Sequence, residues 1–333
     1  MIRIHLSLSI QHISTHFPSA TLDNKQLSSE FNISEEDILK RTGIEKRYLA
    51  AADETASDLA CAAAKKLMAE QPELSKHIDF LIFCSDCFDY IAPATSCILQ
   101  DRLKLPQSIG CIDLPYGCSG FVYGLGIANG LLHSGMAKTI LFLTCDTSTK
   151  TVNPKNFEQR SLFSDAAAAI LLTKDNNAPA NAFVFGTDGS GALDLYIEGS
   201  AFRSPQDEQF KKESCVPYGE MVMNGANIFS FALKVVPKVV NDILEKNALH
   251  MEDIDLFIFH QANGFILETL RRKMNIPKEK FYTNIKDHGN TVASTIPIAL
   301  HTAEQEKVLK KGMKVLLAGF GVGNSWAATV INY

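Results

Sequence analysis

Short runs of apolar residues recur along the chain, and two of them follow longer stretches whose apolar positions repeat every three or four residues. Residues 79–84 read Asp-Phe-Leu-Ile-Phe-Cys, and residues 255–260 read Asp-Leu-Phe-Ile-Phe-His. Runs of this length and composition predict strands buried on both faces. The stretches before them, 55–69 and 226–244, place apolar side chains on one face, which predicts amphipathic helices.

Two further pairs of similar segments follow in the same order. Residues 140–145 resemble 315–320, and residues 164–170 resemble 324–330. Short runs of Val, Ile and Leu resemble one another by chance, but three matched segments in one order indicate an internal duplication.

The duplication predicts an α/β protein of two related halves, 1–176 and 177–333, in which helices pack on layered sheets. Segments 118–133 and 291–304, the second uncharged up to its last residue Glu304, are predicted helices that meet at the centre. Small residues on these helices would permit the close approach: Gly120, Gly124, Ala128, Ala293, Ser294 and Ala299. The polar stretch 202–218 is predicted to be a surface loop.

One segment reaches the length of a membrane span. No Asp, Glu, Lys or Arg occurs from 114 to 137. The segment nevertheless contains six glycines and several polar residues, so a helix buried on all sides by protein explains it better. The N-terminal residues Met1–His5 begin a strand-like alternation without the pattern of a signal peptide. We therefore expect a cytoplasmic protein that does not act in a membrane.

The composition excludes other classes of protein. The 333 residues are 46% hydrophobic, enough for a large core, and 32 basic against 37 acidic residues give a net charge of −5. No basic block occurs, which argues against nucleic-acid binding. The eight cysteines are scattered, as expected for reduced thiols rather than a disulfide framework. Cys84-x-x-Cys87 lacks a second ligand pair, so no metal site is predicted.

Cys118 is the first candidate for chemistry. A Pro/Gly turn joins a strand that ends near Leu114 to the uncharged helix, and Cys118 stands at the start of that helix. Unpaired N–H groups and the helix dipole there would favour the thiolate over the thiol. Gly117 and Gly120 would let a substrate approach the backbone. The alternative interpretation is a small buried apolar residue, as most cysteines are.

Three other segments are candidates for the same site. His260 follows a predicted strand, where α/β proteins place ligands, although a structural histidine is the alternative. Asn290 precedes the second uncharged helix and is the counterpart of Cys118 in the repeat, or else a helix N-cap. The glycine-rich segment 319–324 predicts either a tight hairpin or N–H groups aimed at an oxyanion. If the two halves of the repeat fold alike, these three segments and Cys118 lie at the same edge of the two halves.

With these residues the chain resembles the β-ketoacyl-acyl carrier protein synthase III family of the thiolase superfamily. The resemblance covers nearly the whole chain and rests on these segments: Arg41–Ile44 with Arg47, the surroundings of Cys118, Phe163–Ala166, His260–Asn263, His288–Thr291, and the terminal Gly-Phe-Gly loop with Trp326. It implies a thiolase-like fold, in which two pseudo-repeated α/β halves stack as five layers of helices and sheets.

The resemblance also implies a two-step condensation. Cys118 would take an acyl group as a thioester, and decarboxylation of a malonyl thioester would give an enolate that attacks it. His260 and Asn290 would hydrogen-bond the malonyl thioester oxygen, where neutral or cationic donors suit the developing charge. The N–H groups of Cys118 and Val322 would form the oxyanion hole. Thioesters of acyl carrier protein or coenzyme A would be the substrates, with no further cofactor.

Some positions depart from the family pattern. Asp37 stands where members that use coenzyme A often have a Trp that stacks on adenine. Gly264 and Phe265 replace an Arg that often helps to dock the carrier protein, and Val322 stands where Gly is usual, although its N–H remains. These departures affect the prediction of which acyl donor the protein uses more than the prediction of the reaction itself.

The resemblance implies substrate contacts by four residues: Arg41, Ala92, Asn263 and Phe265. In the family, the loop that here ends at Pro93 caps the acyl pocket of the partner subunit, and a bulky aromatic before the Pro limits chain length. Ala92 therefore predicts longer primers and a homodimer, unless Phe88, Tyr90 or Ile91 refill the space.

Two other functions compete with this reading. An acyltransferase of the same fold would move the acyl group to an alcohol or amine without decarboxylation, and Asn290 argues against it. An inactive subunit of a heterodimer would commonly lack the nucleophile, whereas Cys118, His260 and Asn290 are all present.

Overall fold

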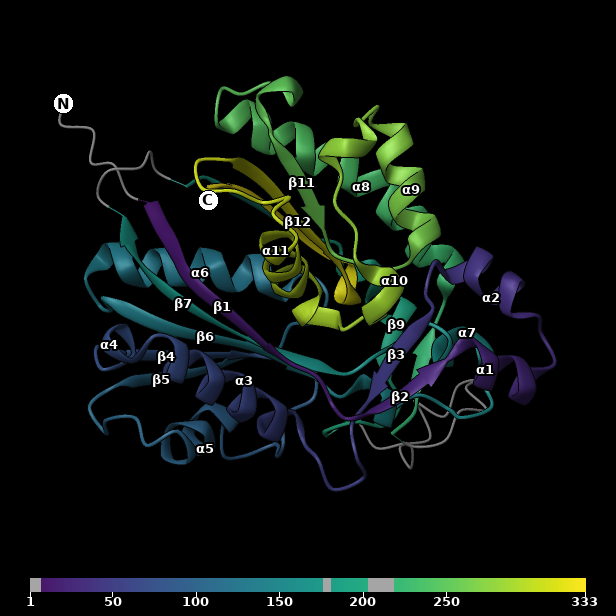
Figure 1. The fold of residues 1–333 in the computed structure, drawn as a ribbon, viewed down its shortest axis with the longest axis horizontal. Helices are drawn as coiled ribbons and strands as arrows, with labels where there is room; N and C mark the ends of the chain where they lie inside the picture. Colours follow the sequence, from purple (N-terminus) through teal and green to yellow (C-terminus); the bar gives the residue numbers. More distant parts are fainter. Residues whose placement is uncertain (1–6, 176–180, 203–218) are drawn as a thin grey trace.

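The computed structural model describes residues 7–175, 181–202 and 219–333. Most of the stretch expected to form a surface loop, 202–218, lies outside these residues, as do the first residues of the chain. Within the described part, two sheets and the helices around them form the body of the molecule (Figure 1).

The first sheet is built from the N-terminal part of the chain. Its strands are β1 (Ser7–His16), β4 (Phe80–Cys84), β5 (Gly110–Leu114), β6 (Thr139–Asp146) and β7 (Ala166–Asp175). They lie in the order β1-β7-β6-β4-β5, with β4 parallel to β5 and β6 and the other pairs antiparallel. Every residue of β6 is buried, as expected of a strand whose apolar middle, 140–143, has neighbours on both faces of the sheet.

The second sheet repeats this arrangement. Its strands are β8 (Phe183–Thr187), β11 (Leu256–Phe259), β12 (Lys314–Gly321) and β13 (Ser325–Asn332). The order β8-β13-β12-β11 matches β1-β7-β6-β4, with the same parallel and antiparallel pairs. The three pairs of apolar segments matched in the sequence are β4 with β11, β6 with β12, and β7 with β13. The internal repeat is therefore confirmed.

Helices separate and cover the two sheets. They are α3 (Ala56–Glu70) and α5 (Thr95–Arg102) on the outer face of the first sheet, α6 (Gly120–Ser134) and α11 (Thr295–Gln305) between the sheets, and α8 (Gly225–Lys246) and α9 (Gly264–Lys273) beyond the second sheet. Figure 1 shows α6 and α11 at the centre. The result is the predicted five-layer arrangement of helix, sheet, helix, sheet and helix.

Smaller elements connect these layers. They are β2 (Ala20–Asp23), α1 (Asn24–Phe31), α2 (Glu35–Thr42), β3 (Lys46–Leu49), α4 (Pro72–Ser75), α7 (Phe157–Arg160), β9 (Leu195–Ile197), β10 (Met221–Met223), α10 (Ile285–His288) and the 3-10 turns η1 (Ser148–Lys150), η2 (Gly189–Asp194), η3 (Met251–Asp253), η4 (Lys278–Lys280), η5 (Val292–Ser294) and η6 (Val322–Asn324). Arg47 of β3 is fully buried and donates to the Ser161 carbonyl and to Asn24. These bonds attach the N-terminal elements to the segment around Ser161.

The small residues of the central helices do not all act as expected. A Cβ at Gly120 would lie 2.4 Å from the Cys84 Sγ on β4 and 3.8 Å from the Cβ of Ala293, so the two central segments are in ordinary contact there while the glycine makes room for the first sheet. At Gly124, however, a Cβ would lie 2.2 Å from the ring of Phe142 on β6. Gly124 therefore makes room for a side chain of the first sheet rather than for the other central helix, which corrects that part of the prediction.

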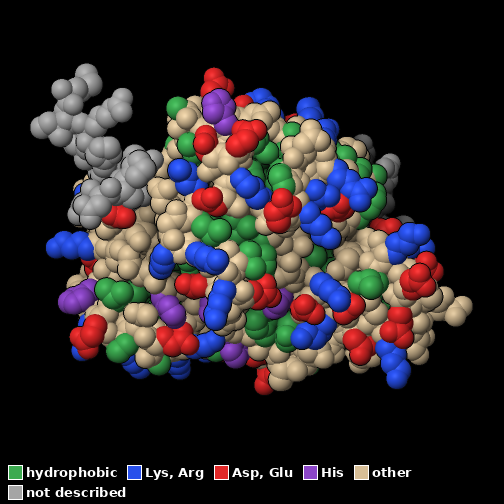
Figure 2. Space-filling view, turned by 45° about the horizontal axis from the view of Figure 1, so that its top comes forward, with side chains coloured by type: hydrophobic (Ala, Val, Ile, Leu, Met, Phe, Trp, Pro, Cys, Tyr) green, Lys and Arg blue, Asp and Glu red, His purple; other side chains and the backbone are tan. Residues whose placement is uncertain are grey.

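The long uncharged segment forms α6, a helix of 15 residues. Its side chains Phe121, Val122 and Leu125 are fully buried, but Ile127 is 36% exposed and Gly130 and Ser134 are exposed as well. The prediction of a helix buried on all sides is therefore wrong for the single chain. Within the described residues, no helix is both long enough and apolar enough to cross a membrane. On the face shown in Figure 2, basic and acidic side chains are interspersed rather than gathered into a patch of one sign.

Candidate active site

A cavity of about 720 Å³ brings together residues that lie far apart in the sequence. Cys118, His260 and Asn290 line it. Three of the four residues implied in substrate contact also line it: Arg41, Asn263 and Phe265. Apolar side chains complete the wall, among them Phe157, Phe163, Leu195, Met223 and Phe229. Most of the predicted site residues therefore converge on one space.

Cys118 lies in the turn between β5 and α6. The N–H groups of Val322 and of Cys118 itself lie near its sulfur and lower the pKa of the thiol. The chain at Gly321 passes so close that a Cβ there would lie 2.8 Å from the Cys118 Sγ and 2.5 Å from its Cβ. Only glycine permits this approach. The segment 319–324 thus forms the tight hairpin between β12 and β13, and the same hairpin brings the Val322 N–H to the Cys118 sulfur.

The expectation that Cys118 is a thiolate is wrong for the resting protein. The pKa of its thiol is raised to about 12: burial is the largest cause, the carboxylates of Asp86 and Asp146 add to it, and the N–H groups of Val322 and Cys118 oppose it. The residue is 5% exposed, and α6 begins only at Gly120. Dehydration therefore outweighs the helix terminus, because water can no longer stabilise the anion.

His260 follows β11, and its ring is buried beside α11. Its Nδ1 lies 2.7 Å from the hydroxyl of Thr295, the first residue of α11. Burial lowers the pKa of His260 to about 3, so the ring is neutral at physiological pH. A neutral imidazole has one N–H, and the partner of Nδ1 decides which nitrogen carries it. Thr295 was not predicted as a site residue, since no local pattern relates it to His260.

The side-chain amide of Asn290 is fixed by two hydrogen bonds. Its Oδ1 accepts the N–H of Val292 at 2.9 Å, and its Nδ2 donates to the Ala262 carbonyl at 3.2 Å. The first bond supports the chain at the start of η5, but the N-cap of η5 is Thr291 and that of α11 is Ser294, so the interpretation of Asn290 as a helix N-cap is wrong. Because Nδ2 carries two hydrogens, one remains for a ligand in the cavity.

Asn263 and its neighbours shape the wall of the cavity. The Asn263 Oδ1 caps α9 by accepting the N–H of Phe265 at 2.7 Å, and its Nδ2 lies 3.4 Å from the Arg41 carbonyl. Asn263 therefore fixes α9 against α2 in addition to lining the cavity. Phe265 is 59% exposed and stacks on Phe229 at 5.7 Å between ring centroids. The Arg41 guanidinium lies 6.0 Å from the ring centroid of Phe157.

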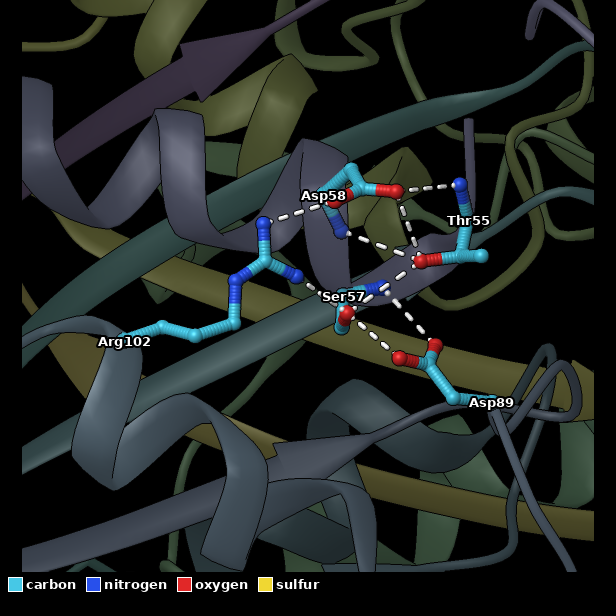
Figure 3. Close-up of polar contacts among 5 residues, drawn as sticks. All are labelled: Thr55, Ser57, Asp58, Asp89 and Arg102. Atoms are coloured by element: carbon cyan, nitrogen blue, oxygen red, sulfur yellow. Dashed lines mark hydrogen bonds and ion pairs between the residues drawn. The ribbon is translucent and has the colours of Figure 1, made fainter. Parts of the chain in front are cut away.

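Polar contacts hold the 85–94 loop in place (Figure 3). The Asp89 carboxylate accepts the hydroxyl and the N–H of Ser57 at the start of α3. Arg102 donates to the same hydroxyl and to Asp58, at 2.6 Å in both cases. The loop is thus anchored to two helices on the outer face of the first sheet.

The exposed side of this loop carries Ala92. The structure does not place Ala92 in the wall of the cavity of its own chain. Its neighbours Tyr90 and Ile91 are 63% and 69% exposed, which is unusual for large apolar side chains. Ala92 therefore acts on an acyl group only if this loop reaches the site of a second subunit.

Comparison with known proteins gives the same family for both parts of the chain. Residues 112–189 match the family model of 3-oxoacyl-[acyl-carrier-protein] synthase III, and residues 244–333 match the model of its C-terminal part. The curated beta-ketoacyl-[acyl-carrier-protein] synthase III of Clostridium perfringens is 37% identical over 315 residues, covering 94% of this chain and 95% of the relative.

Solved structures agree with these matches. A crystal structure of 3-oxoacyl-(acyl-carrier-protein) synthase III superposes with a TM-score of 0.93 at 40% identity, covering 98% of this chain and 100% of that one. The synthase III of Thermus thermophilus gives 0.89 at 32% identity, covering 98% and 99%. The five-layer fold is thus the thiolase-like fold that the resemblance implied. The chain belongs to the β-ketoacyl-acyl carrier protein synthase III family.

Proposed function

We propose that this enzyme condenses an acyl primer, held as a thioester on Cys118, with a malonyl thioester that loses carbon dioxide. The observation that carries the proposal is the meeting of Cys118, His260 and Asn290 in one cavity. A nucleophilic sulfur and two neutral hydrogen-bond donors are the groups that the two half-reactions require.

In the first half-reaction, the Cys118 sulfur bonds to the carbonyl carbon of an acyl thioester while the bond to the donor sulfur breaks. The thiol proton ends on the leaving thiol, so no net charge forms overall. A negative charge develops on the carbonyl oxygen along the way. The N–H groups of Cys118 and Val322, which meet at the sulfur in the resting site, are placed to stabilise it.

In the second half-reaction, the malonyl thioester loses its carboxylate as carbon dioxide, and the electron pair moves into an enolate. The enolate carbon bonds to the acyl carbon, and the Cys118 thiolate leaves and takes up a proton. His260 and the free N–H of Asn290 would donate to the enolate oxygen. The His260 ring and the Asn290 amide are both neutral, so neither repels the incoming malonyl carboxylate.

The purified chain, an acyl donor and malonyl-acyl carrier protein provide the test. We expect carbon dioxide and a 3-oxoacyl thioester in equal amounts. Transfer of the acyl group to an alcohol or amine without carbon dioxide would support the acyltransferase instead. Failure of the chain alone to gain an acyl mass from any thioester would support an inactive partner subunit.

Thr295→Val is expected to slow condensation on the order of tenfold while acylation of Cys118 continues. The Thr295 hydroxyl donates to the Val292 carbonyl at 3.0 Å and lies 2.7 Å from His260 Nδ1. For Nε2 of His260 to donate to a substrate, this hydroxyl must turn from the carbonyl and donate to Nδ1 instead, and valine removes that donor. Rates of the two half-reactions, measured separately, check this positioning role. Thr295→Ser keeps the hydroxyl and should restore condensation; equal rates for the valine and wild-type proteins would contradict the role.

Acyl-carrier-protein donors are expected to acylate Cys118 faster than the matching coenzyme A thioesters. Asp37 is exposed on the first turn of α2, one turn before Arg41. A carboxylate cannot stack on adenine and repels nearby phosphates by roughly 1 to 4 kcal/mol, depending on the local dielectric. Arg41 still offers a phosphate contact, so both donors should bind. The test compares the rates at which the two kinds of donor acylate Cys118 at matched concentrations. Faster acylation by coenzyme A thioesters would refute the expectation.

The 85–94 loop leads to a proposal on chain length and assembly. We expect a homodimer in which Ala92 of each subunit faces the acyl pocket of the other. The wild type should accept primers longer than acetyl, because each buried methylene contributes about 0.8 kcal/mol. Ala92→Phe should shift the profile of accepted primers toward short chains, read by intact mass. A wild type restricted to acetyl, or an unchanged profile in the variant, would contradict this proposal.

A further inference from the structure

The open end of the cavity carries two stacked phenylalanines. Among the residues that line the cavity, Cys118 and His260 are buried, whereas Arg41, Glu158 and Phe265 are exposed. This difference marks the two ends of the space: the nucleophile lies at the inner end, and the exposed residues form the rim. A thioester donor must therefore pass this rim before its acyl group can reach the Cys118 sulfur.

The two rings at the rim belong to neighbouring helices. Phe229 lies near the start of α8 and Phe265 is the second residue of α9, and both line the cavity. Their ring centroids are 5.7 Å apart at an interplanar angle of 21°. Phe265 is 59% exposed in the part of the chain that the structure describes, and its N–H is held by the Asn263 side chain. An exposed aromatic pair on a fixed backbone, beside a ligand cavity, is a surface that a partner covers at a gain in free energy.

The charges at the rim limit what that partner can be. Among the described residues that line the cavity, only Arg41 and Glu158 carry a charge at neutral pH, and the two cancel. Coenzyme A brings several phosphate groups with its arm, whereas an arm attached to a carrier protein brings a single one. One guanidinium pairs with a single phosphate and leaves the other phosphates of coenzyme A without a cation. The rim therefore suits a carrier-bound arm, with the rest of the contact made by apolar surface.

We propose that Phe229 and Phe265 form a docking surface for the acyl carrier protein that delivers the thioester, and that they receive an apolar side chain of the carrier beside the attachment point of its arm. The proposal rests on the proposed function, because it concerns the donors of the two half-reactions. Arg41 holds the phosphate of the arm, and the aromatic pair holds the protein behind it. The body of the carrier is thus recognised by apolar burial rather than by ion pairs.

Acylation of Cys118 by the butyryl thioesters of acyl carrier protein, of coenzyme A and of pantetheine provides the test. All three donors share the arm that enters the cavity, and pantetheine lacks both the carrier and the phosphates. The quantity compared is kcat/KM for the carrier divided by kcat/KM for pantetheine, in which any change to the cavity itself cancels. Phe265→Ser should lower this ratio roughly tenfold, since burial of a large apolar side chain contributes on that order.

Two further variants and a control define the chemistry of the contact. Phe265→Leu keeps an apolar side chain and should retain most of the ratio, whereas Phe265→Arg should lower it as Phe265→Ser does. Met136→Ser is the matched control, because Met136 is 72% exposed and lies just beyond the end of α6 that is remote from Cys118. It does not line the cavity, so its replacement should leave every ratio the same.

A ratio that Phe265→Ser leaves unchanged would overturn the proposal, since the pair would then contact at most the arm that all three donors share. A loss confined to coenzyme A would overturn it as well, because the pair would then hold the nucleotide. So would a Phe265→Arg variant that takes the carrier better than the wild type, which would make the contact ionic. In these cases release of carbon dioxide from malonyl thioester shows that the proposed function stands. If no donor acylates Cys118, the proposed function fails and the docking surface fails with it.

Discussion

Cys118→Ala is expected to abolish acylation of the protein. The acyl intermediate is a thioester, and alanine offers no sulfur to form it. The substitution removes one buried atom from a tightly packed turn, so the fold should persist. Intact-protein mass spectrometry after incubation with an acyl thioester should show the acyl mass on the wild type and none on the variant.

Other cysteines near the site serve as controls for this result. Cys145 is fully buried on β6, and Cys87 lies in the 85–94 loop; burial and nearby carboxylates raise the pKa of both thiols. Cys87→Ala and Cys145→Ala should therefore acylate as the wild type does. Recovery of a labelled acyl group on Cys87 or Cys145, by peptide mapping, would show that the nucleophile has been assigned to the wrong residue.

His260→Ala and Asn290→Ala are expected to slow condensation on the order of 100- to 1000-fold, while Cys118 still gains the acyl group. The oxyanion of the first half-reaction is assigned to the N–H groups of Cys118 and Val322, which neither substitution removes. The enolate of the second half-reaction is assigned to the two side chains. Each variant therefore loses a donor that acts only after acylation.

Measuring the half-reactions separately makes this prediction decisive. Each protein is first acylated to the same extent, as judged by mass, and then mixed with malonyl thioester while carbon dioxide is followed. Asn290→Asp is a useful companion, since its carboxylate would repel the enolate instead of donating to it. Equal losses of acylation and condensation in the alanine variants would contradict the assignment of these side chains to the enolate.

The resting site holds neutral groups, and this follows from its burial. The Cys118 pKa is raised to about 12 and the His260 pKa is lowered to about 3, with dehydration as the largest cause of both shifts. A protonated thiol and a neutral imidazole are therefore present at neutral pH. In the proposed reaction, a neutral His260 can donate to the substrate only from the nitrogen that carries its proton. The contact of Nδ1 with Thr295 influences which nitrogen that is.

The positions of the main strands and helices could be read from the sequence. Residues 79–84 and 255–260 were predicted as strands and form β4 and β11. No end of either strand differs from the prediction by more than one residue. Strands buried on both faces leave continuous apolar runs, and a duplicated fold leaves such runs in the same order. Both the apolar runs and their recurrence are visible in short stretches of sequence. They can therefore be recognised without the tertiary structure.

The main residues of the site could also be predicted from the sequence. The repeat and the family motifs pointed to Cys118, His260, Asn290 and the loop around Val322, and the structure brings these segments together. Thr295 and Phe229 were missed. Each touches the site through a contact with a residue far from it in the chain, and neither lies in a motif that marks such a contact.

The sequence by itself determined the duplicated α/β architecture and the chemical types of residue at the site, because both are written in local patterns. Only the tertiary structure decided the protonation of Cys118, the partner of His260 and the stacking of Phe229 on Phe265. A pKa depends on how much water is excluded and on which charges lie nearby, and those come from segments up to two hundred residues apart. The helix terminus that favoured a thiolate was a real local effect, but burial by both halves of the molecule outweighed it.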